Sequence, residues 1–207
     1  FKIQNKTIEL SLLLSIPASL GLIIASHEIV NALFGYGSFS ADDVYHTSRA
    51  LNFFGYGIPA FALIKVLSNF FFARDNTKTP FYLSLFIVFL NVTISINFFK
   101  EIGFIIIPIS TSISTWFGVI IYFILLNRKK YFTIEKALLK NIVKIILSTL
   151  MMSLILIYSL SFFAENLEYI SKFKSIFLLF IVGFVATIYL IACYLLGVLN
   201  IKNYKTN

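Results

Sequence analysis

Residues 51–80, LNFFGYGIPAFALIKVLSNFFFARDNTKTP, decide how the rest of the sequence is interpreted. Their apolar part is long enough to cross a bilayer, because a membrane-spanning helix needs about 20 predominantly apolar residues. One lysine, Lys65, lies near the middle of this apolar run. A charge at mid-depth in such a helix costs about 2.5–3.5 kcal/mol on insertion scales, so Lys65 requires a physical reason. The run ends at a compact polar turn that leads into Pro80.

The composition is that of an integral membrane protein of the all-α class. Of the 207 residues, 59% are hydrophobic and 13% are charged, and the mean hydropathy is +0.91. The apolar runs are continuous rather than alternating, which favours helices. The net charge of +8 lies in short segments between these runs, where basic residues set membrane orientation, so we expect no nucleic-acid partner. The single cysteine, Cys193, provides no disulfide framework.

A polytopic bundle of six membrane-spanning helices is predicted, since each apolar run has about the length of one crossing. Three of the runs contain an internal proline, at Pro17, Pro59 and Pro108. Each proline either kinks its helix for packing or serves as a hinge. The predicted spans are residues 8–26, 51–72, 80–99, 104–126, 138–163 and 173–199.

Lysine and arginine are distributed unevenly between the two ends of this bundle. Twelve lie on the side of the two termini, four lie on the opposite side, and Lys65 lies within the membrane. Because cytoplasmic loops carry the excess of basic residues, we expect both termini in the cytoplasm. The sequence begins with Phe1 rather than methionine, and we expect the chain to be the C-terminal part of a longer protein.

The predicted spans fall into two groups. Residues 1–127 hold four of them, with an outer loop at about 26–50 in which a short helix and a glycine turn precede a helix opened by Ser40 or Ala41. Residues 128–144 form a basic amphipathic linker, which we expect along the anionic inner leaflet. Residues 145–207 hold two additional spans and a short cytoplasmic tail.

No catalytic constellation is present in the sequence, and we expect the protein not to be an enzyme. The spans hold no carboxylate pair, no His/Cys cluster and no glycine-rich phosphate loop. Lys65 is the candidate substrate-cavity residue. It either reaches an interface or an acidic partner, or it lines a water-filled cavity and meets an anionic substrate such as a phosphate.

A second polar feature joins two neighbouring spans. Asn91 and Ser95 lie one helical turn apart, and Thr111 lies in the next span. These side chains either hydrogen-bond between helices or supply oxygen ligands to a small cation such as Na⁺. No other metal and no cofactor is expected.

The polar turn itself has a mainly structural interpretation. Its candidate residues are Arg74, Asp75, Lys78 and Pro80. Arg74 is expected either to pair with Asp75 or to cap the last carbonyls of the preceding helix, and Pro80 suits the first turn of the next one.

Four motifs together resemble a known family. They are SIPASLGL at residues 15–22, LFGYGSF at 33–39, GIPA at 57–60 with KVL at 65–67, and FARDNTKTP at 72–80. Their order and spacing resemble the C-terminal half of the MurJ/MviN family, the bacterial lipid II flippases of the MOP (MATE-like) superfamily. The resemblance covers all six spans, which would be the last six of the family's fourteen.

This resemblance implies an architecture of two six-helix lobes around a central cavity, followed by two extra helices. The first four spans would complete the second lobe, and the last two would leave an apolar groove suited to a lipid tail. The cargo would be lipid II, the undecaprenyl-linked peptidoglycan precursor, flipped across the bacterial inner membrane by alternating access. Membrane lipids and the missing N-terminal helices of the same protein would be the other partners.

The resemblance also assigns expectations to single residues. Lys65 matches a motif position, and Arg74 and Lys78 match the cytoplasmic turn. Some family members are thought to bind sodium between helices similar to residues 80–99 and 104–126. Asn91 and Thr111 would fit there, but Ser95 stands where an acid is sometimes found, which weakens the sodium site.

Two alternatives remain open from the sequence. One is another MOP exporter, either a polysaccharide-precursor flippase or a MATE-type antiporter, although the motif at residues 72–80 argues against it. The other is a membrane scaffold that transports nothing.

Overall fold

A computed structural model describes residues 1–199, and every regular element among them is helical. The elements are α1 (Lys2–Ile24), α2 (Ser26–Phe34), α3 (Ala41–Gly55), α4 (Ile58–Phe72), α5 (Lys78–Ile102), a 3₁₀ turn η1 (Gly103–Ile105), α6 (Ile106–Arg128), α7 (Lys136–Phe162), α8 (Ala164–Leu167) and α9 (Lys174–Leu195). The predicted all-α class is confirmed.

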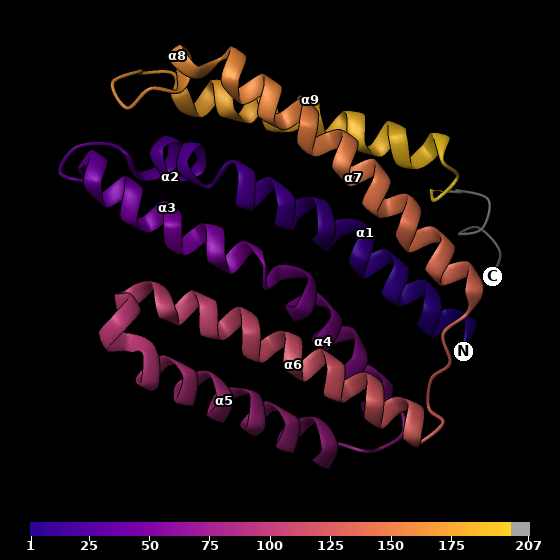
Figure 1. The fold of residues 1–207 in the computed structure, drawn as a ribbon. Helices are drawn as coiled ribbons and strands as arrows, with labels where there is room; N and C mark the ends of the chain where they lie inside the picture. Colours follow the sequence, from indigo (N-terminus) through magenta and orange to yellow (C-terminus); the bar gives the residue numbers. More distant parts are fainter. Residues whose placement is uncertain (200–207) are drawn as a thin grey trace.

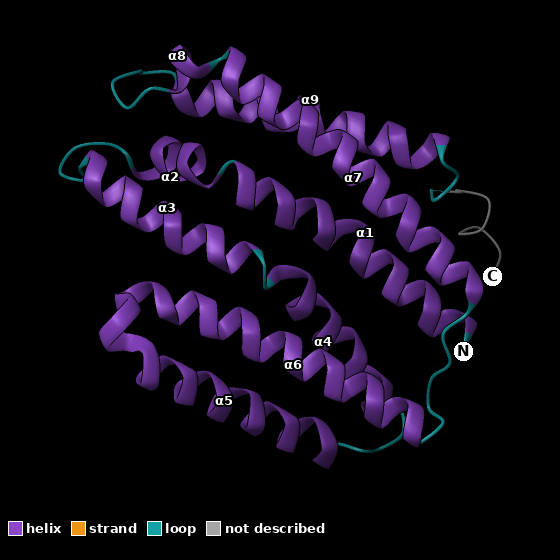
Figure 2. Ribbon diagram, viewed as in Figure 1, coloured by secondary structure: helices purple, strands orange, loops and turns teal. Residues whose placement is uncertain are grey.

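The long helices lie side by side, with α1 in the middle of the bundle (Figure 1). On one side α1 packs against α7, which packs against α9, and on the other side it packs against α3 and α4. Helix α6 covers α4, and α5 covers α6. The loops gather at the two ends of the bundle (Figure 2), so functional side chains are presented either at an end or along a helix face.

The number of membrane crossings depends on how two pairs of helices are counted. By length and hydropathy, residues 1–199 hold four segments that can cross a membrane, or five if the bent pair α3 and α4 is one span. One of these segments, Lys78–Arg128, contains α5 and α6, which double back on one another in Figure 1. The predicted six is reached only when α5 and α6 are counted separately.

Two apolar cores stabilise the bundle, and α1 contributes to both. Leu13 of α1 packs into a core formed with α7 and α9, around Met152 and Ile181. Ile8 and Leu12 pack on the other side, into a core formed with α4 and α6. This two-sided burial explains why the first predicted span has no polar face.

The outer loop has the predicted order of a short helix, a glycine turn and a second helix. Helix α2 ends before Gly35, and Gly37 has a positive φ of 62°. Ser40 caps α3, because its hydroxyl accepts from the backbone N–H of Asp43 at 3.2 Å and the Asp43 carboxylate accepts from Ser40 N–H at 2.9 Å. This reciprocal capping box satisfies two of the free donors at the helix start.

The span predicted over residues 51–72 is not one helix. It is divided into the end of α3 and all of α4, which meet at an angle of 41°. Two glycines flank Tyr56 at the break, and Pro59 lies in the first turn of α4 rather than inside a span. A kink or hinge at Pro59 was expected, and the bend lies beside it, but apolar length alone did not show that the two glycines end α3 before α4 begins.

The basic linker also differs in form from its prediction. Only residues 129–135 connect α6 to α7, and residues 136–144 are the first turns of the long helix α7. The final residues of the predicted sixth span and the predicted tail, residues 200–207, lie outside the described residues.

Candidate functional site

An apolar groove runs between α1 and the C-terminal helices α7 and α9. It encloses about 470 Å³ and reaches Ile29 of α2 at one end. Gly21 leaves open space here, since a Cβ at this position would have no atom within 4 Å. The groove can therefore accept a hydrocarbon chain. Residues that line it include Ala18, Gly21, Met152, Leu156, Val185 and Tyr189.

A buried lysine, Lys174, fixes the start of α9 to the end of α2. Its side chain is 0% exposed. Its ammonium donates to Asn31 Oδ1 at 3.0 Å, to the Gly35 carbonyl at 2.7 Å and to the Tyr169 carbonyl at 2.9 Å. It also lies over the Tyr36 ring, 4.2 Å from the ring centre, and a second ring, that of Tyr169, lies at 4.8 Å. Carbonyl oxygens and ring faces thus take the place of a carboxylate partner.

The inner end of the same helices is joined by a second polar contact. Glu9 of α1 is buried, and its carboxylate accepts from the Asn141 amide at 2.8 Å and from Lys6 at 2.5 Å. Asn5 bridges α1 to the linker, donating to the Thr133 carbonyl at 2.9 Å and accepting from Glu135 N–H at 3.1 Å. The C-terminal helices are therefore held to α2 and the residue after it at one end and to α1 at the other, with the groove between the two contacts.

Lys65 lies on the exposed face of α4, opposite the side that is buried against α1 and α6. Phe61 and Asn69 share this face at four-residue spacing. Within residues 1–199 the Lys65 ammonium has no hydrogen bond or ion pair, so the acidic partner considered from the sequence is not found there. Its role in a substrate cavity stays a prediction.

The polar turn after α4 is held by Arg74. Its guanidinium donates to the Phe70 carbonyl at 2.6 Å and to the Tyr131 carbonyl at 2.9 Å. It also lies 4.6 Å from the centre of the Tyr131 ring. Of the two predicted arrangements, capping of the helix carbonyls is the one observed, and the contact with the linker was not anticipated. Asp75 instead adopts a positive φ of 53° at the turn.

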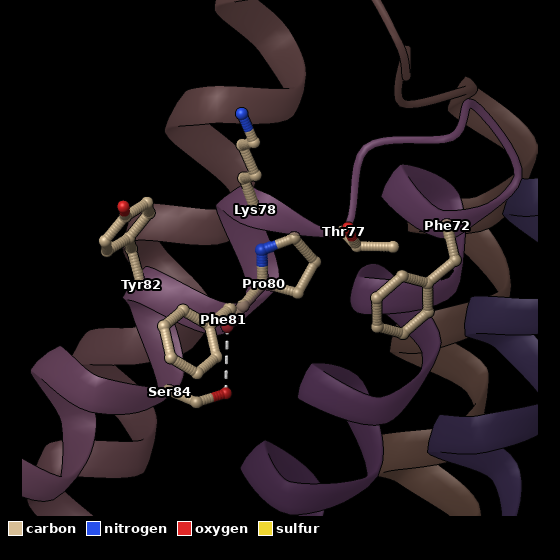
Figure 3. Close-up of a pocket in the computed structure, with 7 residues that line it drawn as sticks. All are labelled: Phe72, Thr77, Lys78, Pro80, Phe81, Tyr82 and Ser84. Atoms are coloured by element: carbon tan, nitrogen blue, oxygen red, sulfur yellow. Dashed lines mark hydrogen bonds between the residues drawn. The ribbon is translucent and has the colours of Figure 1, made fainter.

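The start of α5 contributes the other side of this turn. A shallow cavity of about 490 Å³ separates Phe72 from Pro80 and Phe81 (Figure 3). Pro80 lies in the first turn of α5, as predicted. Lys78 and Tyr82 point away from Phe72 in Figure 3, so the lysine is presented at the surface.

The polar residues of α5 and α6 meet in one hydrogen-bonded cluster. The Asn91 amide donates to Thr111 Oγ1 at 2.8 Å, and Ser110 Oγ lies 2.6 Å from Ser95 Oγ. Asn91 Oδ1 accepts from the hydroxyls of Ser95 and Ser110 at 3.3 and 3.2 Å. Interhelical hydrogen bonding, the first of the two interpretations, is therefore present.

This cluster does not fit a resident cation. Its four side-chain oxygen atoms are all neutral and already accept or donate hydrogen bonds within the cluster. A hard cation such as Na⁺ is normally held by several oxygen ligands with carboxylates among them. Among residues 1–199, no group of three or more His, Cys, Asp or Glu side chains lies close enough to hold a metal.

Sequence reasoning missed two sets of residues. The burial of Lys174 was not anticipated, because in the sequence it is one of the four basic residues expected in segments between spans on the side opposite the termini. Ser19, Ser112 and Trp116 were not connected with residues 53–56, whose carbonyls they bind. Only the tertiary fold brings these helices together, so no local pattern could have shown it.

The chain was compared with known proteins. A family model described as "Lipid II flippase MurJ" matches residues 2–178. A "Probable lipid II flippase MurJ" from Rickettsia prowazekii is 33% identical over 205 residues, which cover 98% of this chain and 40% of that protein. A protein with the same description from Rhizobium tropici is 31% identical over 156 residues, covering 75% of this chain and 29% of its own length.

A solved structure shares the fold. It is described as "Lipid II flippase MurJ, inward closed conformation", and it matches with a TM-score of 0.74 at 26% identity. The match covers 93% of this chain and 38% of the solved chain. The chain thus spans 40% or less of the length of these three proteins.

Proposed function

This chain belongs to the lipid II flippase MurJ family, and we propose that it forms the C-terminal part of a transporter that moves lipid II across the bacterial cytoplasmic membrane. The proposal rests on the family match over residues 2–178 and on the apolar groove between α1, α7 and α9. Transport of this kind moves a lipid between leaflets without a covalent step. The activity would belong to the whole protein, of which lipid II is the proposed cargo.

The groove is the observation that carries the proposal. Lipid II consists of a polar headgroup on a long polyprenyl tail, and a tail of this kind needs an apolar surface along the membrane normal. The groove is open to such a chain and is bounded by small residues, Ala18 and Gly21, on α1. Because it lies beside the lobe formed by α1 and α3 to α6, a tail held there would leave the headgroup free to enter a cavity of that lobe.

Lys65 is the proposed contact for the headgroup. It lies on the free face of α4, where a charge facing lipid would be unfavourable by about 2.5–3.5 kcal/mol. A water-filled cavity shared with further helices of the same protein would remove this cost. A diphosphate has the charge that a lysine ammonium recognises.

The functional test uses a bacterium depleted of its own lipid II flippase and rescued by the gene that encodes this chain, with all of its coding sequence. Gly21→Leu would project a side chain into the groove, because no atom lies within 4 Å of a Cβ at this position. Gly183→Leu is the matched control, since Gly183 has the same open surroundings on α9 but does not line the groove. We expect Gly21→Leu to abolish rescue and Gly183→Leu to retain it.

Lys65→Ala completes the test, with Lys65→Arg as the variant that keeps the charge. We expect Lys65→Ala to reduce rescue and Lys65→Arg to restore most of it. If the wild-type protein is inserted in the membrane at normal levels and still does not rescue growth, the proposed function is wrong.

A further inference from the structure

The joint between α3 and α4 is held open by side chains of two neighbouring helices. Ser112 Oγ of α6 donates to the Phe53 carbonyl at 2.8 Å, and Trp116 Nε1 of α6 donates to the Tyr56 carbonyl at 2.9 Å. Ser19 Oγ of α1 donates to the Gly55 carbonyl at 2.7 Å. These are carbonyls that lose their usual partners where the helix bends by 41°.

The three hydrogen bonds are not equivalent, and Pro59 is the reason. In a continuous helix each carbonyl accepts from the N–H four residues later. The Gly55 carbonyl would need a backbone N–H from residue 59, but proline has none. This carbonyl therefore needs the Ser19 hydroxyl in any helical arrangement. Phe53 and Tyr56 would find the N–H groups of Gly57 and Ala60. In the bent form Gly57 N–H donates to the Phe54 carbonyl at 2.9 Å, so straightening would pass this N–H to Phe53 and that of Ile58 to Phe54. The carbonyls of Phe53 and Tyr56 would then exchange α6 side chains for backbone donors.

Neighbouring helices pack closely against the joint, and its two glycines allow a wide range of backbone dihedral angles. A Cβ on Gly57 would lie 2.8 Å from Ser112 Oγ and 3.3 Å from Ser112 Cα. A Cβ on Gly55 would lie 2.7 Å from Ile23 Cγ1. Glycine at both positions lets α1 and α6 approach the backbone, and it leaves φ and ψ with the widest range of any residue.

We propose that this joint is a hinge, in which Ser19 on α1 is a fixed pivot and Ser112 and Trp116 on α6 are a releasable latch. When α6 moves away, the latch opens, the two carbonyls take backbone donors and α3 becomes more nearly collinear with α4. Straightening would separate the His46 ring of α3 from the Phe104 ring of η1, which lies 5.9 Å away, and would change the distance between α3 and α5. The inference goes beyond the proposed function and does not depend on it.

The latch is tested by distance measurement between spin labels on the full chain in lipid nanodiscs. Cys193 is replaced by serine, and labels are attached at the exposed positions Thr47 on α3 and Asn97 on α5. Thr47 lies nine residues from Tyr56, so complete straightening of a 41° bend would move it sideways by about 9 Å. The Pro59 ring preserves part of the kink, which makes about 9 Å an upper bound.

We expect the variant Ser112→Ala with Trp116→Phe to add a second population to the distance distribution, shifted by several ångströms. Ser114→Ala is the matched control on α6, because its hydroxyl bonds only the Thr111 carbonyl of its own helix, and it should match the wild type. The single variants Ser112→Ala and Trp116→Phe each remove one latch bond and keep the test valid if the double variant does not fold. A distribution identical to that of the wild type in the folded latch variants would overturn the hinge.

The pivot is tested by suppression. Ser19→Ala leaves the Gly55 carbonyl without a donor and should lower the thermal unfolding midpoint without adding a second distance population. Pro59→Ala supplies the missing N–H, so we expect it to restore the midpoint when combined with Ser19→Ala. If Pro59→Ala gives no recovery, Ser19 is not the pivot.

Discussion

Lys174 shows that a lysine can be buried beside an apolar helix without a carboxylate. Three oxygen acceptors and two aromatic rings surround its ammonium. Two acceptors lie in α2 and directly after it, and the third lies in the loop before α9, so one side chain joins the start of α9 to the distant end of α2. The residue therefore stabilises the outer end of the C-terminal helices rather than setting membrane orientation alone.

The variant Lys174→Met is expected to lower the free energy of unfolding by about 3 kcal/mol, because three buried acceptors lose their donor. Unfolding by SDS in mixed micelles measures this change. Lys172→Met is the control, since Lys172 is exposed two residues earlier, and it should change stability by less than about 0.5 kcal/mol. Equal effects of the two variants would show that the buried hydrogen bonds contribute little.

Arg74 connects the polar turn to the linker in the same manner at the opposite end of the molecule. Arg74→Ala removes two charge-assisted hydrogen bonds to carbonyls, and we expect a loss of about 1.5–3 kcal/mol in unfolding free energy. Proteolysis within residues 129–135 should also become faster, because Tyr131 is released. Lys78→Ala, on the exposed start of α5, should leave both measurements unchanged. A stable Arg74→Ala variant with a protected linker would contradict this role.

The roles of these residues could be predicted from the sequence to different degrees. Arg74 capping was predictable because its spacing from the preceding helix end is local. Its contact with Tyr131 depends on how the linker returns across the bundle, which no local pattern encodes. Lys65 was identified by the cost of its charge, and its exposed position on α4 agrees with a residue that needs a partner outside residues 1–199.

At the scale of elements, α5 and α6 are joined by the polar cluster around Asn91. The sodium site predicted at Asn91, Ser95 and Thr111 stays a prediction, and the neutral oxygens observed there give it a direct test. Replacing NaCl with KCl at equal ionic strength should leave the unfolding midpoint of the wild type unchanged. Ser95→Asp adds a carboxylate to three neutral oxygen ligands, so we expect its midpoint to rise in NaCl relative to KCl.

The control for this experiment is Thr93→Asp, which adds the same charge to an exposed position of α5 whose hydroxyl bonds its own helix. It should show no difference between the two salts. A wild-type midpoint that is higher in NaCl would show that the neutral cluster already binds sodium.

Helix positions were predicted well where hydropathy and capping agree. Ser40 caps the start of α3 because its side chain and the Asp43 carboxylate complete a capping box, and this pair can be recognised in the sequence. Pro59 predicted a kink or hinge in this span, but the side chains that satisfy its free carbonyls were not predicted, since an apolar run looks the same whether or not neighbouring helices supply donors. Ser112 and Trp116 make the bend possible from more than 50 residues away.

At the scale of the whole molecule, the groove results from where α7 and α9 are attached. Polar contacts fix both ends of these helices to α1 and α2, and small residues on α1 keep the middle open. The groove that the family resemblance implies is present, and these polar contacts anchor the C-terminal helices on either side of it. The core around Met152 lines the groove on one side of α1, and the core around Ile8 and Leu12 joins α1 to the lobe on the other side.

The charge distribution of the folded chain predicts which end faces the cytoplasm. Ten lysines and arginines lie at the end that holds the start of α1, the α4–α5 turn and the linker, and four lie at the opposite end. Two more, Lys202 and Lys205, lie outside the described residues. Because basic loops are retained in the cytoplasm, the linker should be cytoplasmic and the loop before α9 should face outward.

Single cysteines measure this orientation in spheroplasts whose chain carries Cys193→Ser. A membrane-impermeant maleimide should label Lys172→Cys in intact spheroplasts, since that loop residue is exposed on the outer side. It should label Thr133→Cys, an exposed linker residue, only after permeabilisation. Labelling of Thr133→Cys in intact spheroplasts would contradict the predicted topology and indicate the opposite one.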